Sequence, residues 1–165
     1  MEIITQKAIM LMLAASQARA KLSMPVITKI LYLTDWKCAI ELGRTFTGLR
    51  WFLAEYGPEV EDYEILEFLS SRRFARRQEQ ASSGEQSHYK LKRPVQISVK
   101  DMDPDFIRIL TFAMKTAAEK GAEDLDLLVM STYPVITTDI YGKLDLVKKA
   151  KEYRPIRDNN LAQAG

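Results

Sequence analysis

The side chains of this sequence with the most reactive chemistry are one histidine, one cysteine and a set of carboxylates. His88 is the only histidine, so a metal site made of several histidines is excluded, and any histidine-based catalytic set would depend on this residue alone. Cys38 lies in an apolar run of helical spacing, and no basic side chain clearly shares its face, so we interpret it as a small packed side chain rather than a nucleophile. Neither residue predicts catalysis or metal binding.

Carboxylates would supply acid–base chemistry, for which enzymes use pairs of them. Those at predicted helix starts already have a reason to be there, because a helix N-terminus attracts negative charge. The glycines Gly43, Gly48 and Gly57 match neither glycine-rich phosphate-binding pattern, so nucleotide binding has no support. We therefore predict no catalytic residue, no enzyme and no cofactor, although a buried carboxylate cluster around Asp35 would reopen the question. The carboxylates considered are Asp35, Glu41, Glu55, Glu59, Glu61 and Asp62.

Basic side chains are concentrated where we expect a β-hairpin. Residues 74–80 and 88–91 are the predicted strands, and a polar, serine-rich tip lies between them. One interpretation of this hairpin is a wing that contacts phosphates; the other is a charged edge that prevents aggregation. Because the formal net charge is only +2, we favour the second and keep nucleic-acid binding as the alternative. The basic residues are Arg72, Arg73, Arg76, Arg77, Lys90, Lys92 and Arg93.

Trp51 and the tripeptide Tyr56-Gly57-Pro58 have the residue types of a turn and of a binding surface. Gly57 permits an unusual backbone angle or a close approach, and Pro58, which precedes several acidic residues, predicts the first turn of a third helix. Trp51 and Tyr56 would provide the aromatic area that binding hot spots favour if they were partly exposed, although such aromatics more often belong to a core.

We predict helices for most of the chain, and these helices would position the residues described above. The apolar periodicity of residues 4–18 predicts a first helix buried nearly all round. Ser23 and Pro25 begin a second helix, which Gly43 ends. Residues 49–54 are either a short strand or a buried extended segment, and residues 95–99 a further extended piece. Later helices are expected at residues 104–121, 122–132 and 144–153.

Length and composition indicate one ordinary globular domain. The chain has 165 residues, of which 47% are hydrophobic and 28% charged. We predict a mainly α (α+β) class, a compact helical domain over residues 1–157 with a small β-hairpin or sheet, and a frayed tail over residues 158–165. The single cysteine favours the reducing cytoplasm. The apolar run 8–15 is shorter than the roughly 20 residues that a bilayer requires, so no membrane segment is expected.

Several short motifs occur in a fixed order in the first third of the chain. Leu31, Tyr32 and Asp35 form an L-Y-x-x-D helix, which is followed by Gly43, by the Thr47-Gly48 turn and by Tyr56-Gly57-Pro58. In this combination the chain resembles the Panacea domain, also called the SocA-type antitoxin domain. The resemblance covers this third closely and the later helices loosely.

The resemblance implies a compact, mainly helical fold with a small β element and a protein partner. Members of that family neutralise a toxin encoded beside them, often in bacterial or prophage defence loci, and one branch is a proteolytic adaptor for its toxin. We accordingly expect an antitoxin-like binding domain whose partner is a cognate toxin. Its contact or supporting residues would be Tyr32, Asp35, Trp51, Tyr56, Gly57 and Pro58. Exposed aromatics near Trp51 would also favour a homodimer.

Overall fold

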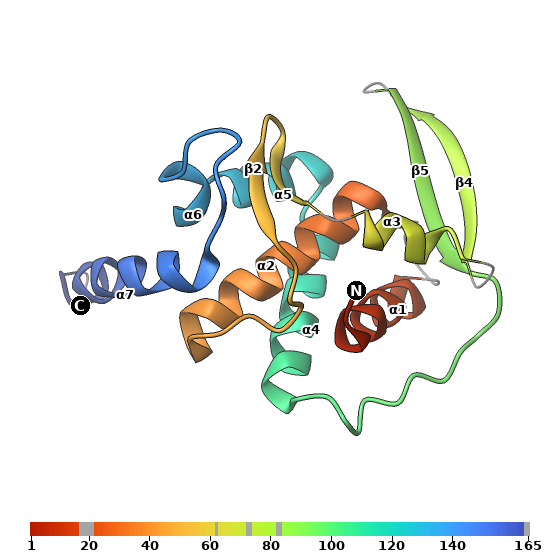
Figure 1. The fold of residues 1–165 in the computed structure, drawn as a ribbon, viewed down its shortest axis with the longest axis horizontal. Helices are drawn as coiled ribbons and strands as arrows, with labels where there is room; N and C mark the ends of the chain where they lie inside the picture. The colour runs from red at the N-terminus through yellow and green to blue at the C-terminus, as the bar shows by residue number, and fades with distance from the viewer. Residues whose placement is uncertain (17–21, 62, 72–73, 82–83, 164–165) are drawn as a thin grey trace.

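A computed structural model describes residues 1–16, 22–61, 63–71, 74–81 and 84–163, with only the backbone described for 79–81 and 84–86. The fold is mainly α with a small β component, as the sequence predicts (Figure 1). In chain order its elements are α1 (Ile3–Ser16), β1 (Leu22–Ser23), α2 (Met24–Leu42), β2 (Trp51–Ala54), β3 (Gly57–Val60), α3 (Glu64–Leu69), β4 (Phe74–Ala81), β5 (Gly84–Leu91), α4 (Pro104–Glu119), α5 (Ala122–Met130), α6 (Tyr133–Ile136) and α7 (Leu146–Gln163).

Helix α2 is the centre of the fold, and most other elements pack against it. It contacts α4 and α7 along its length, and the β2–β3 hairpin lies across it. Pro25 occupies its first turn, and Gly43 ends it in the left-handed conformation with φ of 73°. The start and end of this helix were therefore predicted correctly. Its interior is apolar on nearly all sides because it has neighbours on nearly all sides.

Two small antiparallel sheets flank α2. One has the strand order β1-β5-β4 and contains the expected basic hairpin, with Phe74 opposite Leu91. The other consists of β2 and β3, with Trp51 opposite Val60. Helix α1 packs against β5. Its fully buried residues are Thr5, Ala8, Ile9, Met12 and Leu13. Only Ile3 and Ala15 of this helix are exposed, so α1 is at least partly buried on most sides, close to the prediction.

The third helix begins later than predicted. Gly57–Val60, expected to lead into that helix through Pro58, is strand β3, and α3 begins only at Glu64. The pairing of Ala54 with Gly57 leaves Glu55 and Tyr56 as a two-residue hairpin turn. Pairing with β2 thus overrides the local signal of a proline followed by acidic residues.

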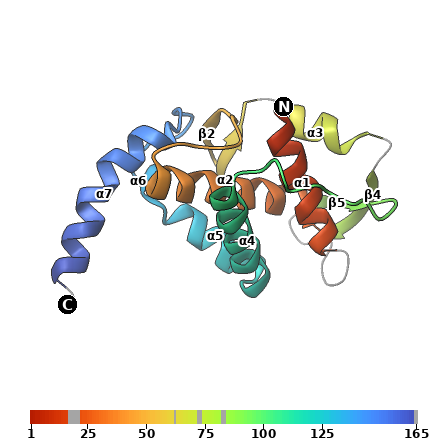
Figure 2. The ribbon, with the colours of Figure 1, turned by 90° about the horizontal axis from the view of Figure 1, so that it is seen from below.

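The C-terminal helices are close to their predicted positions. Asp103 caps α4 by accepting a hydrogen bond from the backbone N–H of Asp105 at 2.8 Å, and Pro104 follows in the first turn. Residues 95–99 have no regular secondary structure. Helix α7 extends through Gln163 and projects from the body (Figure 2), so residues 158–163, expected to fray, are helical and exposed.

Helix α7 is anchored at one turn to the end of α2. The guanidinium of Arg154 donates to the carbonyl oxygens of Ala39 and Ile40, both at 2.7 Å. These carbonyls belong to the last turn of α2, where intrahelical donors become scarce, and the Ala39 oxygen also accepts the backbone N–H of Gly43 at 3.2 Å. About one turn earlier in α2, the ring of Trp36 packs near that of Tyr153, with the two ring centroids 5.6 Å apart. The end of α2 is therefore closed by a helix distant in sequence.

Gly57 provides a test of the β2–β3 hairpin. Its φ of 122° is strained for any other residue, whereas a Cβ there would meet Met130 Sδ at an ordinary 3.5 Å. We expect Gly57→Ser to lower the free energy of unfolding by about 1–3 kcal/mol through backbone strain alone. Gly121→Ser is the matched control: its φ is −65°, a Cβ meets nothing within 4 Å, and serine suits a helix N-cap. Urea unfolding of both variants measures the difference, and equal stabilities would contradict it.

Candidate protein-binding site

Asp35 is a fully buried carboxylate that accepts hydrogen bonds from the segment following α2. The backbone N–H groups of Phe46 and Thr47 both donate to Oδ1 at 3.1 Å. The indole Nε1–H of Trp51 donates to Oδ2 at 3.0 Å, and the Thr47 hydroxyl donates to the same oxygen. One side chain of α2 therefore holds both the turn and the start of β2.

The surroundings of Asp35 are those of a structural carboxylate. Burial raises the pKa of Asp35, while hydrogen bonds from Thr47, Trp51 and Phe46 act in the opposite direction. Among the residues that the structure describes, no second carboxylate contributes to this shift, so they form no carboxylate cluster around Asp35 of the kind that would suggest acid–base chemistry.

The Thr47-Gly48 turn is connected to α1 as well as to α2. The Thr5 hydroxyl donates to the carbonyl oxygen of Thr47 at 2.7 Å, and the backbone N–H of Leu49 donates to Thr47 Oγ1 at 3.2 Å. Gly48 has a φ of 66°, which favours glycine. The Thr47-Gly48 turn is therefore hydrogen-bonded to both α1 and α2.

Tyr32 connects α2 to two further elements. Its hydroxyl lies 2.7 Å from Thr132 Oγ1 beyond α5, and its ring meets that of Trp51 edge-on, with centroids 5.5 Å apart. Burial raises the pKa of Tyr32 well above its ordinary value, so the hydroxyl stays protonated. Tyr32, Asp35 and Trp51 are 0%, 0% and 2% exposed, which makes them an internal framework.

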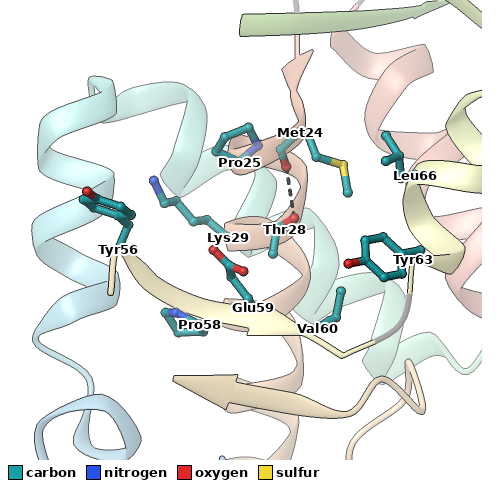
Figure 3. Close-up of a pocket in the computed structure, with 10 residues that line it drawn as sticks. All are labelled: Met24, Pro25, Thr28, Lys29, Tyr56, Pro58, Glu59, Val60, Tyr63 and Leu66. Atoms are coloured by element: carbon teal, nitrogen blue, oxygen red, sulfur yellow. Dashed lines mark hydrogen bonds between the residues drawn. The ribbon is translucent and has the colours of Figure 1, made fainter. Parts of the chain in front are cut away.

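A groove of about 440 Å³ opens on the surface above this framework, between β3, α3 and the first half of α2 (Figure 3). Most of its lining is apolar. Thr28 donates to the carbonyl oxygen of Met24 at 3.0 Å, and Lys29 forms an ion pair with Asp126. We call it the tyrosine groove; its lining residues are Met24, Pro25, Thr28, Lys29, Tyr56, Pro58, Glu59, Val60, Tyr63 and Leu66.

Two exposed tyrosines lie at opposite ends of the tyrosine groove (Figure 3). Tyr56 is 81% exposed and Tyr63 is 84% exposed. Between them Gly57 and Pro58 are buried and set the course of β3. Of the residues expected to contact or support a partner, Tyr56 and Pro58 line the groove, and Tyr32, Asp35 and Trp51 lie inside.

Sequence reasoning missed Tyr63 and the residues that α2 contributes to the groove. A third helix that began at Pro58 would have included Tyr63. Residues 57–60 form strand β3 instead, and Tyr63, just before α3, is exposed to solvent. The sequence identifies Pro25 and Lys29 only as residues of a helix. No local signal indicates which face of that helix borders a groove.

The structure accounts for part of the basic hairpin. Arg72 and Arg73 lie outside the described residues. Lys92 and Arg93 follow β5 and are exposed.

The basic side chains of the two strands do not share one face. Directly opposed residues of an antiparallel pair lie on the same face, and successive residues alternate. Arg76 is opposite Tyr89, and Arg77 is opposite His88. Arg77 and Lys90 therefore lie on one face of the hairpin and Arg76 on the other, so Arg76 and Arg77 cannot contact a phosphate backbone from the same face.

The part of the chain that the structure describes assembles no metal site: no three His, Cys, Asp or Glu side chains there lie close enough to share an ion. Burial chiefly, followed by the charge of Asp35, raises the pKa of the Cys38 thiol to about 12, which keeps it protonated. None of the described helices is long and apolar enough to cross a membrane.

The fold and the groove together define a mainly helical domain with a surface cleft and a buried polar framework. Comparison with known families matches residues 27–133 to the family described as "Antitoxin SocA-like, Panacea domain". The match covers more than half of the chain, so the chain belongs to this family, as the motif order predicts, and membership points to an antitoxin-type role. No curated protein and no solved structure matches the chain.

The framework can be tested by replacing the carboxylate of Asp35 with an amide. In Asp35→Asn an N–H donor faces other donors, and we expect the free energy of unfolding to fall by about 2–4 kcal/mol. Asp101→Asn is the matched control, because the Asp101 side chain is 82% exposed and lies 3.7 Å from Lys7. That change should cost less than about 1 kcal/mol. Urea unfolding of both variants is the measurement, and a similar cost would contradict the framework.

The same variant has a predicted pH dependence. Because the pKa of Asp35 is higher in the folded chain than in the unfolded one, its contribution is complete below the unfolded pKa of about 3.9 and decreases as pH rises through the folded pKa. The destabilisation by Asp35→Asn should therefore be smaller at about pH 8 than at about pH 5. An increase with pH would indicate that the hydrogen bonds outweigh burial.

Cys38 should report unfolding. Only the thiolate reacts with iodoacetamide, and a pKa of about 12 leaves very little thiolate in the folded chain. We expect alkylation at about pH 8 to be roughly a thousandfold slower in the native protein than in guanidinium, where the thiol pKa is about 8.5. Mass spectrometry follows the reaction. Rapid alkylation of the native chain would show that Cys38 is accessible.

Proposed function

We propose that this protein is a non-enzymatic antitoxin-like binding domain that neutralises a cognate toxin by direct association through the tyrosine groove. The observation that carries the proposal is the pair of exposed tyrosines, Tyr56 and Tyr63, at the two ends of an apolar groove. Family membership supports a toxin as the partner. The reducing cytoplasm is the proposed location.

The groove has the physical properties of a binding surface. Tyrosine provides a large, rigid contact area at a low entropy cost, and it is enriched among binding hot spots. Tyr56 extends from the turn of the hairpin, which the framework holds in place through β2, and Tyr63 extends from the start of α3. A partner would therefore meet a surface that is already organised, which reduces the entropy lost on binding.

Nucleic-acid binding through the basic hairpin is the less favoured alternative, since Arg76 and Arg77 lie on opposite faces. A proteolytic adaptor would use the same groove and would differ only in the fate of the toxin. These three functions make different predictions for one co-expression experiment.

The experiment is co-expression with the product of the adjacent gene, which must be toxic when expressed alone. We expect the wild-type chain to restore growth and to co-purify with the toxin. Tyr56→Ala and Tyr63→Ala should each weaken association by about 30-fold, the effect of losing about 2 kcal/mol at a hot spot. Calorimetry of the purified proteins measures the affinity.

Phe112→Ala is the matched control, because Phe112 is an exposed aromatic residue, 54% exposed, on α4. It should leave affinity within about threefold of the wild type, as most exposed contacts do. Toxin that persists at normal level in rescued cells indicates neutralisation, whereas toxin that disappears indicates an adaptor. Full rescue without association, or tyrosine variants that bind normally, would reject the groove. Light scattering of the purified chain detects a homodimer, in which the same tyrosines would be covered.

A further inference from the structure

We propose that the partner inserts an extended segment into the tyrosine groove, where it pairs with the outer edge of β3 as an additional strand. This inference rests on the proposed function and specifies how the groove is used. It follows from which backbone groups of the β2–β3 sheet have partners and which do not.

One edge of this sheet is already occupied. The backbone N–H of Leu53 donates to the carbonyl oxygen of Gly142 at 2.9 Å, and that of Leu144 donates to the carbonyl oxygen of Trp51 at 2.9 Å. The N–H of Tyr141 donates to the carbonyl oxygen of Leu53 at 2.6 Å. The segment 141–144 therefore covers the outer edge of β2, and the sheet can grow only beyond β3.

The outer edge of β3 has unpaired backbone groups. Because Leu53 and Trp51 direct their backbone groups to 141–144, the opposite pairs Leu53–Pro58 and Trp51–Val60 are not hydrogen-bonded to each other. The carbonyl oxygen of Pro58 and both the N–H and the carbonyl oxygen of Val60 thus point away from β2. No described residue makes a backbone hydrogen bond to them. Alternating groups of this kind match the backbone of another strand.

The groove lies along this edge. Pro58, Glu59 and Val60 form one side, and Pro25, Thr28 and Lys29 of α2 form the floor (Figure 3). A strand placed there would lie over the first half of α2, beside β3, which already contacts α2. Between the tyrosines, β3 is four residues long, so a guest strand of about four or five residues would fill it at about 3.3 Å per residue.

The groove also indicates the composition of the guest strand. Its inward side chains would meet apolar surface at Met24, Val60 and Leu66. On the outward face Glu59 is exposed and has no ion-pair partner among the described residues, whereas Lys29 is already paired with Asp126. A segment that alternates apolar residues with a Lys or Arg beside Glu59 is therefore favoured. A helix would leave the Val60 N–H without a partner.

The test uses the complex of the intact chain with the product of the adjacent gene, purified after co-expression. Amide hydrogen exchange is measured by NMR in the free chain and in the complex. We expect the Val60 amide to exchange at least tenfold more slowly in the complex, because it is the amide of β3 that points outward and would gain a hydrogen bond from the guest strand. The Glu59 and Glu61 amides point to β2, so they serve as internal references and should change much less.

A pair of variants tests the edge independently. Val60→Pro removes the outward N–H, whereas Val60→Thr keeps both the N–H and the branched side chain. We expect Val60→Pro to weaken association with the toxin at least tenfold and Val60→Thr to stay within threefold. If Val60→Pro fails to fold, as judged by circular dichroism, the exchange measurement on the wild-type chain decides.

The outcomes separate this inference from the proposed function. If the wild-type chain does not associate with the toxin, both fail. If it associates and the tyrosine variants weaken binding, but Val60 exchange is unchanged, then the groove is used without strand addition and only this inference is overturned. Selective slowing at Val60 supports both.

Discussion

The burial of one carboxylate constrains the rest of this structure. A carboxylate inside a protein is costly unless its oxygens accept hydrogen bonds, and Asp35 sits in the middle of the central helix with no exposed surface. Its oxygens are satisfied only when the segment 46–51 folds back over α2. The position of β2 is thereby set, and with it the hairpin that carries the tyrosine groove. The hydrogen bonds of Asp35 therefore connect the central helix directly to the hairpin that borders the tyrosine groove.

This organisation separates support from contact. Tyr32, Asp35 and Trp51 determine where the hairpin lies and are hidden from any partner. Tyr56 and Tyr63 are available to a partner and have little part in the core. If the proposed function holds, changes at the second group would alter what is bound with small effects on folding, whereas changes at the first group would alter folding itself. Such a division allows a binding surface to vary on an unchanged scaffold.

Much of the fold could be predicted from local signals, but the groove could not. Helical periodicity with Pro25 at the start and Gly43 at the end defines α2, and Asp103-Pro104 defines the start of α4, because caps act within one turn. The course of residues 57–60 depends instead on pairing between Val60 and Trp51, nine residues away, and nothing local overrides the misleading proline and acids. Tyr63 was misplaced for that reason. Tyr32 and Asp35 stand out in the sequence because they belong to an ordered motif, whereas exposure at the groove results from tertiary packing.

The hydrogen bonds from Arg154 to the end of α2 come from outside the region that matches the family. Residues 27–133 carry the match, yet the carbonyl oxygens of Ala39 and Ile40 accept hydrogen bonds from Arg154, and the carbonyl oxygen of Thr47 accepts one from Thr5. A fragment trimmed to the matched region would contain every recognisable motif and lose the donors that close its central helix and turn. In this protein the segments that identify the family and the segments that complete it are different parts of the chain.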